Sequence, residues 1–287
     1  MRTLMFLCAL LSVGTTIAIL FALAVPTLEF FRDVPIGEFL TGRDWAPLFS
    51  PPEFGVLPLI SATLVTTGCA LLVCVPFGLG TAIYLSEYAG SRTRSILKPV
   101  IELLAGIPTV VFGFFALTFV TPLLQRTWPF GEPPETFNAL SAGLVMGVMI
   151  LPIVASLSED AMTAVPDSLR AGAAALGGSR FQVATRVVVP AALSGIVASF
   201  VLAISRAVGE TMIVLIAAGS APQLTADPRE AMQTMTAFIA SAGIGDQSTG
   251  SIGYKTIFAV GATLFVATLA MNLVSIRLVR RFREVYE

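Results

Sequence analysis

Two charged residues lie inside an apolar stretch that is long enough to cross a lipid bilayer. The stretch runs from residue 196 to residue 219, and Arg206 and Glu210 lie near its middle. A helix of about 20 apolar residues spans the hydrocarbon core, where a single charge costs about 2.5–3.5 kcal/mol on insertion scales. Residues four apart share one face of a helix. We therefore expect both charges on one face of a membrane-spanning helix.

The Arg206 and Glu210 pair allows two interpretations. In the first, the two charges neutralise each other, or partners on neighbouring helices, and simply hold a helix bundle together. In the second, their face lines a water-filled path, where Arg206 offers its donors to an anion while Glu210 orients the guanidinium. Because ionisable residues within a membrane commonly mark a transport pathway, we favour the second interpretation.

Composition places the chain in the polytopic membrane class. Of its 287 residues, 55% are hydrophobic and 12% are charged, and the mean hydropathy is +0.86. The net charge of −1 gives no reason to expect nucleic acid as a partner. The absence of histidine excludes Ser-His-Asp and Cys-His catalysis and histidine metal sites. We expect Cys8, Cys69 and Cys74, which all lie in apolar segments, to be buried small hydrophobes.

Six apolar runs predict six membrane-spanning helices. They cover residues 4–27, 55–84, 100–124, 139–157, 196–219 and 254–276. The first run is longer than the core of a signal peptide, which favours a retained span over a cleaved leader. Gly106 and Pro108 predict a kink in the third run. Residues 28–54 read as an external loop with Trp45 at the membrane interface, and residues 231–242 as a short helix lying against the bundle.

The distribution of basic residues predicts the orientation. With both termini in the cytoplasm, the inner segments hold eleven Lys and Arg residues and the outer segments hold four. This ratio agrees with the positive-inside rule. The polar segment before the fifth run, residues 158–190, is then cytoplasmic as well.

This cytoplasmic segment has the pattern of two short helices around a glycine turn. The first helix begins at Pro166 and ends at Gly177-Gly178. The second opens at Ser179, with Gln182 at capping-box spacing, and is closed by Pro190. The segment is either a compact knob that a partner recognises or a hairpin that merely connects two spans.

The same segment resembles the EAA loop of ABC-importer permeases. That loop has the pattern Glu-Ala-Ala, three residues, Gly, nine residues, Ile-x-Leu-Pro. This chain has Ala171-Gly172-Ala173, then Gly177, then Val-Val-Val-Pro ending at Pro190. Gly177 and Pro190 match in register, whereas Ala171 replaces the usual glutamate. The resemblance implies that Ala173, Leu176, Gly177, Gly178, Arg180 and Pro190 dock on an ATPase.

Further segments resemble the PstC-type permeases of phosphate-specific ABC importers. These are residues 84–89, 103–117, 203–214 and 234–239. The resemblance implies an all-α, six-helix protein of the type I ABC-importer permease fold, in a bacterial inner membrane, with a coupling helix between spans 4 and 5. It also implies a permease domain over residues 55–287, preceded by a first helix and external loop over residues 1–54.

The resemblance implies a division of labour between chains. The partners would be a second, PstA-like permease, a dimeric ATPase that binds ATP and Mg, and an extracytoplasmic phosphate-binding protein. The chain has no Gly-x-x-x-x-Gly-Lys-Ser/Thr loop of its own, so it is expected to be a non-catalytic subunit without a cofactor. Arg206 would contact inorganic phosphate in transit, Glu210 would restrain Arg206, and Ser205 and Thr211 would add hydrogen bonds.

Other functions remain open at this point. A secondary transporter or anion channel would use Arg206 without an ATPase, and it predicts gradient-driven flux through the isolated chain. A sulfate, molybdate or phosphonate permease would share the EAA-like loop. A membrane-embedded hydrolase is disfavoured, because the adjacent Glu159 and Asp160 point to different helix faces, and Glu102 and Glu210 have no evident carboxylate partner.

Overall fold

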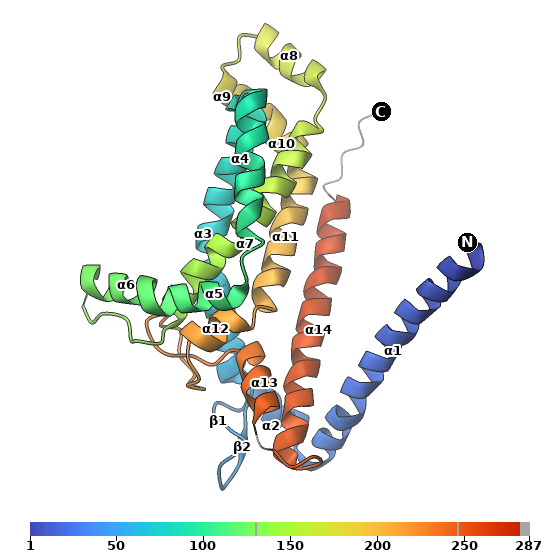
Figure 1. Ribbon diagram of the computed structural model, residues 1–287, viewed down its shortest axis with the longest axis vertical. Coiled ribbons are helices and arrows are strands. Elements are labelled where there is room, and N and C mark those ends of the chain that lie inside the picture. The colour runs from blue at the N-terminus through green and yellow to red at the C-terminus, as the bar shows by residue number, and fades with distance from the viewer. Residues whose placement is uncertain (130, 246, 282–287) are drawn as a thin grey trace.

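The computed structural model describes residues 1–129, 131–245 and 247–281 and is built almost entirely of helices (Figure 1). Within these described residues, five helices are long and apolar enough to cross a membrane, and the number rises to six if a bent helix pair counts as one span. In the described part of the chain, the only sheet pairs β1 (Trp45–Ala46) with β2 (Glu53–Phe54) in antiparallel register. The predicted all-α membrane fold is confirmed.

The elements follow one another in a simple order. The helices are α1 (Arg2–Asp33), α2 (Ile36–Thr41), α3 (Leu57–Ile83), η1 (Tyr84–Tyr88), α4 (Ser91–Leu104), α5 (Thr109–Phe115), η2 (Ala116–Val120), α6 (Thr121–Thr127), α7 (Ala139–Thr163), α8 (Asp167–Ala175), α9 (Arg180–Val183), η3 (Ala184–Val188), α10 (Val189–Ala191), α11 (Leu193–Val208), α12 (Met212–Ala217), α13 (Met235–Ile244) and α14 (Ile252–Arg281). Residues 282–287, which include the predicted inner Arg283, lie outside the described residues.

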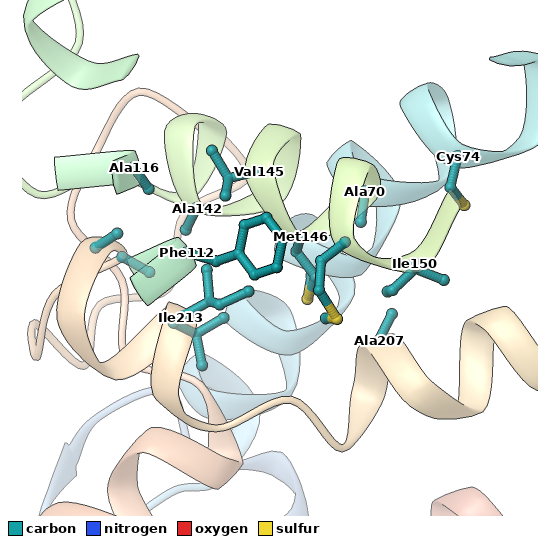
Figure 2. Close-up of a cluster of buried hydrophobic side chains, with 14 of the residues drawn as sticks. Ala70, Cys74, Phe112, Ala116, Ala142, Val145, Met146, Ile150, Ala207 and Ile213 are labelled. Carbon is teal, nitrogen blue, oxygen red and sulfur yellow. The ribbon is translucent and has the colours of Figure 1, made fainter. Parts of the chain in front are cut away.

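The pair α3 and α7 forms the centre of the molecule. Two glycines of α7 allow the backbones to touch: a Cβ added at Gly143 would lie 2.9 Å from the Thr66 carbonyl oxygen, and one at Gly147 would lie 2.6 Å from that of Ala70. Small residues at such contacts permit close packing between membrane helices. Figure 2 shows the apolar cluster around this pair, with Phe112 of α5 inserted between α7 and α12.

The prediction that the third apolar run forms a single kinked helix is wrong, because the run is divided between separate helices. The chain forms α4, breaks after Leu104, and restarts as α5 with Pro108 at its N-cap position. Proline has no backbone N–H and is extended here, so the helical hydrogen bonds cannot continue across it. The segment from α5 to α6 then lies across the upright helices (Figure 1). Length and apolarity alone still qualify residues Thr109–Thr127 as a candidate span.

The end of the molecule opposite α8 holds an aromatic cluster (Figure 1). Phe30, Phe39 and Phe54 belong to the same buried cluster as Trp45. Trp45 is only 4% exposed and meets Phe238 of α13 edge-on at 4.9 Å between ring centroids. Tertiary contacts therefore bury the Trp45 ring inside the protein, while its predicted depth at the membrane interface stays a prediction. The predicted short helix between the fifth and sixth runs is confirmed as α13, which packs into this cluster.

The loop before α7 and the loop before α13 are joined by one arginine. Arg229 donates through Nη1 to the Glu132 carbonyl oxygen at 3.0 Å, and its own carbonyl accepts from the Glu135 backbone N–H at 2.9 Å. Its guanidinium also pairs with Asp227 at 2.5 Å and lowers the pKa of that carboxyl. The segment before α13 is thus held against the segment before α7.

The three cysteines are all free, as expected. Cys69 and Cys74 are buried in α3, whereas Cys8 is exposed on α1, which leans away from the other helices (Figure 1). The prediction of burial is therefore wrong for Cys8, because none of the described elements packs on the first turns of α1.

The end of α7 carries a buried carboxylate that two cations of α4 hold. The Glu159 side chain is 0% exposed and pairs with Arg94 and, at 2.8 Å, with Lys98 Nζ. The adjacent Asp160 is 57% exposed and also receives Lys98, at 2.5 Å. The two carboxylates thus differ in burial. Removing the charge of the buried Glu159 would weaken its ion pairs with both Arg94 and Lys98.

We expect Glu159→Gln to lower the free energy of unfolding by about 1–3 kcal/mol, because it weakens buried, charge-assisted bonds. The matched variant Asp160→Asn removes a largely exposed charge and is expected to cost less than about 1 kcal/mol. Denaturant unfolding of the purified protein in detergent measures both. Equal losses for the two variants would contradict the importance of burial.

Candidate functional site

The fifth predicted span is not one continuous helix. It consists of α11, which ends at Val208, a break over residues 209–211, and the short helix α12. At its other end, α11 follows the helical segment Arg180–Ala191 at a bend of 72°. The expectation of an unbroken helix over residues 196–219 is therefore wrong. Arg206 lies in the last turn of α11, and Glu210 lies in the break.

The two charges nevertheless meet. Arg206 Nη1 lies 2.7 Å from Glu210 Oε2. The Glu210 side chain is 2% exposed, whereas that of Arg206 is 39% exposed. Arg206 Nη2 also approaches Met149 Sδ of α7 at 3.8 Å. A guanidinium has five N–H donors, so this partly exposed side chain keeps donors for a ligand while one edge stays fixed.

Glu210 explains the break itself. Its Oε1 accepts hydrogen bonds from the backbone N–H groups of Met212, at 3.0 Å, and Ile213, at 3.4 Å. The first N–H groups of a helix have no partner within the helix, and a carboxylate there is favoured by hydrogen bonding and by the helix dipole. One carboxylate therefore caps α12 and holds Arg206 at the same time.

Ser205 and Thr211 lie near the pair, but each has a structural partner. Ser205 Oγ donates to Asn272 Oδ1 of α14 at 3.0 Å, which joins α11 to the last helix. Thr211 Oγ1 donates to the Gly209 carbonyl oxygen across the break at 3.4 Å. Sequence reasoning missed Asn272, although a lone amide in an apolar run is a usable signal for an interhelical hydrogen bond.

The predicted knob is present at the other end of the molecule. Helix α8 ends at Ala175, Gly177 adopts a positive φ of 83°, and Ser179 opens α9 with a capping box to Gln182. Its tip is apolar and open, with Leu176 92% exposed and Phe181 68% exposed. The knob therefore presents hydrophobic side chains that none of the described residues covers.

Pro190 does not close the second helix as predicted. The helical path continues through η3 and α10 to Ala191, and the bend comes after it. Pro190 lies in the first turn of α10. Proline is tolerated in the first turn of a helix, where its missing N–H has no helical acceptor.

Arg170 anchors the knob, and sequence reasoning missed it. Its Nη2 donates to the Met162 carbonyl oxygen at 2.8 Å, and its Nη1 donates to that of Val165 at 2.5 Å, at the C-terminal end of α7. Arg170 Nη2 also lies 3.1 Å from Glu87 Oε1 of η1. A cation is favoured at a helix C-terminus, where carbonyl groups lack partners. The sequence signal that could have indicated this ion pair was Glu87, an acidic residue in the segment 84–89.

Two cavities flank the knob. One of about 460 Å³ is lined by Glu87, Tyr88, Ala89, Gly90, Arg170, Ala174, Gly178, Arg180 and Val183. Another of about 480 Å³ is lined by Ala173, Leu176, Gly177, Gly178, Gln182, Val183, Arg186 and Val187. All of the predicted coupling residues except Pro190 thus lie around one protrusion. Figure 1 shows that α8, in this protrusion, lies far from the end of α11, which carries Arg206.

The family model described as "binding-protein-dependent transport system inner membrane component" matches residues 74–284. The chain belongs to this family. The matched range contains the break, the Arg206 and Glu210 pair, and the knob. The family assignment confirms a multi-pass membrane protein of the transport-permease class.

Among curated proteins, the chain is 37% identical to the probable ABC transporter permease YqgH of Bacillus subtilis, over 92% of this chain and 85% of that protein. It is 37% identical to the phosphate transport system permease PstC 1 of Mycobacterium tuberculosis, over 79% and 73%. It is 30% identical to PstC of Haemophilus influenzae, over 93% and 88%.

Solved permease structures share the fold. A bacterial alginate ABC transporter in complex with an alginate-bound periplasmic protein has a TM-score of 0.69 at 16% identity, covering 99% of this chain and 96% of that chain. The MetNI methionine ABC transporter in an inward-facing conformation has a TM-score of 0.56 at 17% identity, covering 80% and 95%. These likenesses confirm the ABC-importer permease fold.

Proposed function

We propose that this chain is the membrane permease subunit of an ATP-driven phosphate importer. The observation that carries the proposal is a partly exposed arginine, held by a buried carboxylate at a helix break, in a chain with several relatives described as phosphate permeases. In this proposal the chain supplies half of the translocation pathway, and a PstA-like permease supplies the other half.

The chemistry of the pair suits a transported oxyanion. Phosphate carries one to two negative charges near neutral pH, and it needs compensation in a cavity of low dielectric constant. The planar fork of Arg206 matches phosphate oxygens. The negative charge of Glu210 partly offsets the positive charge of Arg206, so phosphate is bound weakly enough to be released. Ser205 and Thr211 are proposed as additional hydrogen-bonding groups. Because a hydroxyl has one proton, Ser205 would have to release Asn272 Oδ1, and Thr211 the Gly209 carbonyl oxygen, before donating to the anion.

We propose the knob as the contact with a dimeric ATPase that binds ATP and Mg. Its exposed Leu176 and Phe181 would enter a groove of that partner, and Arg170 would transmit the displacement to α7 and η1. In Figure 1, the N-terminal end of α1 and the C-terminal end of α14 both point away from the end of the molecule that holds β1 and β2, toward the end that holds the knob. Together with the positive-inside distribution, this favours cytoplasmic termini in the bacterial inner membrane.

Reconstitution tests the proposal. In proteoliposomes that hold this chain, a PstA-like permease and the ATPase, phosphate uptake is expected to require ATP hydrolysis and a phosphate-loaded extracytoplasmic binding protein. Sulfate or molybdate in excess is expected not to replace phosphate. Gradient-driven phosphate flux through vesicles that contain this chain alone would contradict the permease proposal and support a secondary transporter or channel.

A further inference from the structure

A chain of threonine hydroxyls connects α13 to the break between α11 and α12. The backbone N–H of Ala237 donates to Thr234 Oγ1 at 3.2 Å, and Thr234 Oγ1 lies 3.1 Å from Thr236 Oγ1. Thr236 Oγ1 donates to the carbonyl oxygen of Glu210 at 2.6 Å. Both threonines are buried. The chain therefore ends on the residue that holds Arg206.

Counting donors sets the direction of every bond in this chain. A threonine hydroxyl has one proton to donate. Thr236 uses that proton on the Glu210 carbonyl, so the hydroxyl of Thr234 must donate to Thr236 Oγ1. Thr234 Oγ1 in turn accepts the Ala237 N–H and so caps α13. Bonds that follow one another in a single direction polarise each other and strengthen the chain.

Glu210 needs this bond because it lies in the break. A buried carbonyl without a helical partner costs free energy unless another donor reaches it. Thr236 supplies that donor from 26 residues away. Glu210 is thereby held at its main chain by Thr236 and at its carboxylate by Arg206 and the first N–H groups of α12.

The helix that carries the two threonines is itself held in place. The Met235 backbone N–H donates to Thr63 Oγ1 of α3 at 3.1 Å. The same helix α13 packs Phe238 and Ala242 into the aromatic cluster that contains Trp45. Helix α13 is therefore held both by the central helix α3 and by the aromatic cluster.

We propose that Thr234 and Thr236 are positioning residues for the Arg206 and Glu210 pair. They hold the main chain of Glu210, and through its carboxylate they set where the guanidinium of Arg206 meets the anion. This inference rests on the proposed role of Arg206. It adds that the geometry of the pair is set by α13, a helix that contributes no charge to it.

The test compares three threonine variants in the assembled transporter in proteoliposomes, with a phosphate-loaded binding protein outside. Thr236→Val keeps the shape and removes the hydroxyl, and it is expected to lower the maximal uptake rate by about 10-fold or more, because small misplacements are costly. The half-saturating concentration of loaded binding protein is expected to stay unchanged. Thr236→Ser, which restores the hydroxyl, is expected to restore most of the rate.

Thr256→Val is the matched control. Thr256 is also fully buried, but its hydroxyl donates only to the Gly253 carbonyl of its own helix. We expect uptake close to that of the unmodified transporter. An equal loss in Thr256→Val and Thr236→Val, or a loss in Thr236→Ser as large as in Thr236→Val, would overturn the positioning role.

Arg206→Gln in the same assay separates the two proposals. If it abolishes uptake while Thr236→Val transports normally, the positioning role is wrong and the proposed function stands. If Arg206→Gln transports normally, the proposed anion contact fails, and with it any positioning through that contact. Loss of uptake in both Arg206→Gln and Thr236→Val, with uptake restored in Thr236→Ser, supports the inference.

Discussion

Arg206→Gln is expected to reduce phosphate uptake by about 100-fold or more while the transporter still assembles. Charge-assisted hydrogen bonds contribute about 1.5–3 kcal/mol each, and loss of two of them corresponds to at least about 100-fold, since 1.4 kcal/mol is a factor of ten. Assembly is expected to survive, because Glu210 keeps its bonds from Met212 and Ile213. Radiolabelled phosphate uptake measures the first effect, and co-purification of the subunits measures the second.

Two variants serve as controls for Arg206. Arg206→Lys keeps the charge but loses the planar fork, so an intermediate uptake rate is expected. Arg229→Gln removes an arginine of similar exposure that is also paired with a nearby carboxylate, but in the loop before α13. It is expected to leave most of the uptake. Full uptake by Arg206→Gln would refute the contact with the anion.

Gly177→Val is expected to uncouple ATP hydrolysis from transport. Gly177 has a φ of 83°, whereas a Cβ added there would meet nothing within 4 Å. The obstacle is therefore the backbone conformation and not a lack of space. Left-handed backbone costs about 1–2 kcal/mol for an ordinary residue, and a β-branched side chain is a stronger outlier there. The turn would change shape and move Leu176 and Phe181 away from their partner.

The assembled transporter in proteoliposomes measures this effect as phosphate transported per ATP hydrolysed. We expect this ratio to fall by about 10-fold, the factor that a loss of 1.4 kcal/mol produces. Gly172→Ala is the matched control, because it also places a Cβ in open space but within helix α8, where alanine is favoured over glycine. Normal coupling in Gly177→Val would show that the segment only connects two spans.

The knob was predictable because local signals define it. A glycine at the turn and the Ser179 and Gln182 capping box act within a few residues, and the structure contains both. The central helix α7 was predictable for a similar reason, since a long apolar run between polar segments has few alternatives. Pro108 was recognised as a breaking point, but its consequence was not, because the new direction of α5 follows from the packing of Phe112 into the core.

The amino-acid sequence by itself determined that this chain is a multi-pass membrane protein with an arginine and a glutamate close together in its fifth apolar run. Hydropathy and spacing carry that information. Only the tertiary structure decided that the run is broken between the two charges, that Thr236 supports Glu210, and that Arg170 holds the knob. Each of these features depends on contacts between residues of different elements. A buried polar group pairs with the donor or acceptor that the fold brings close to it.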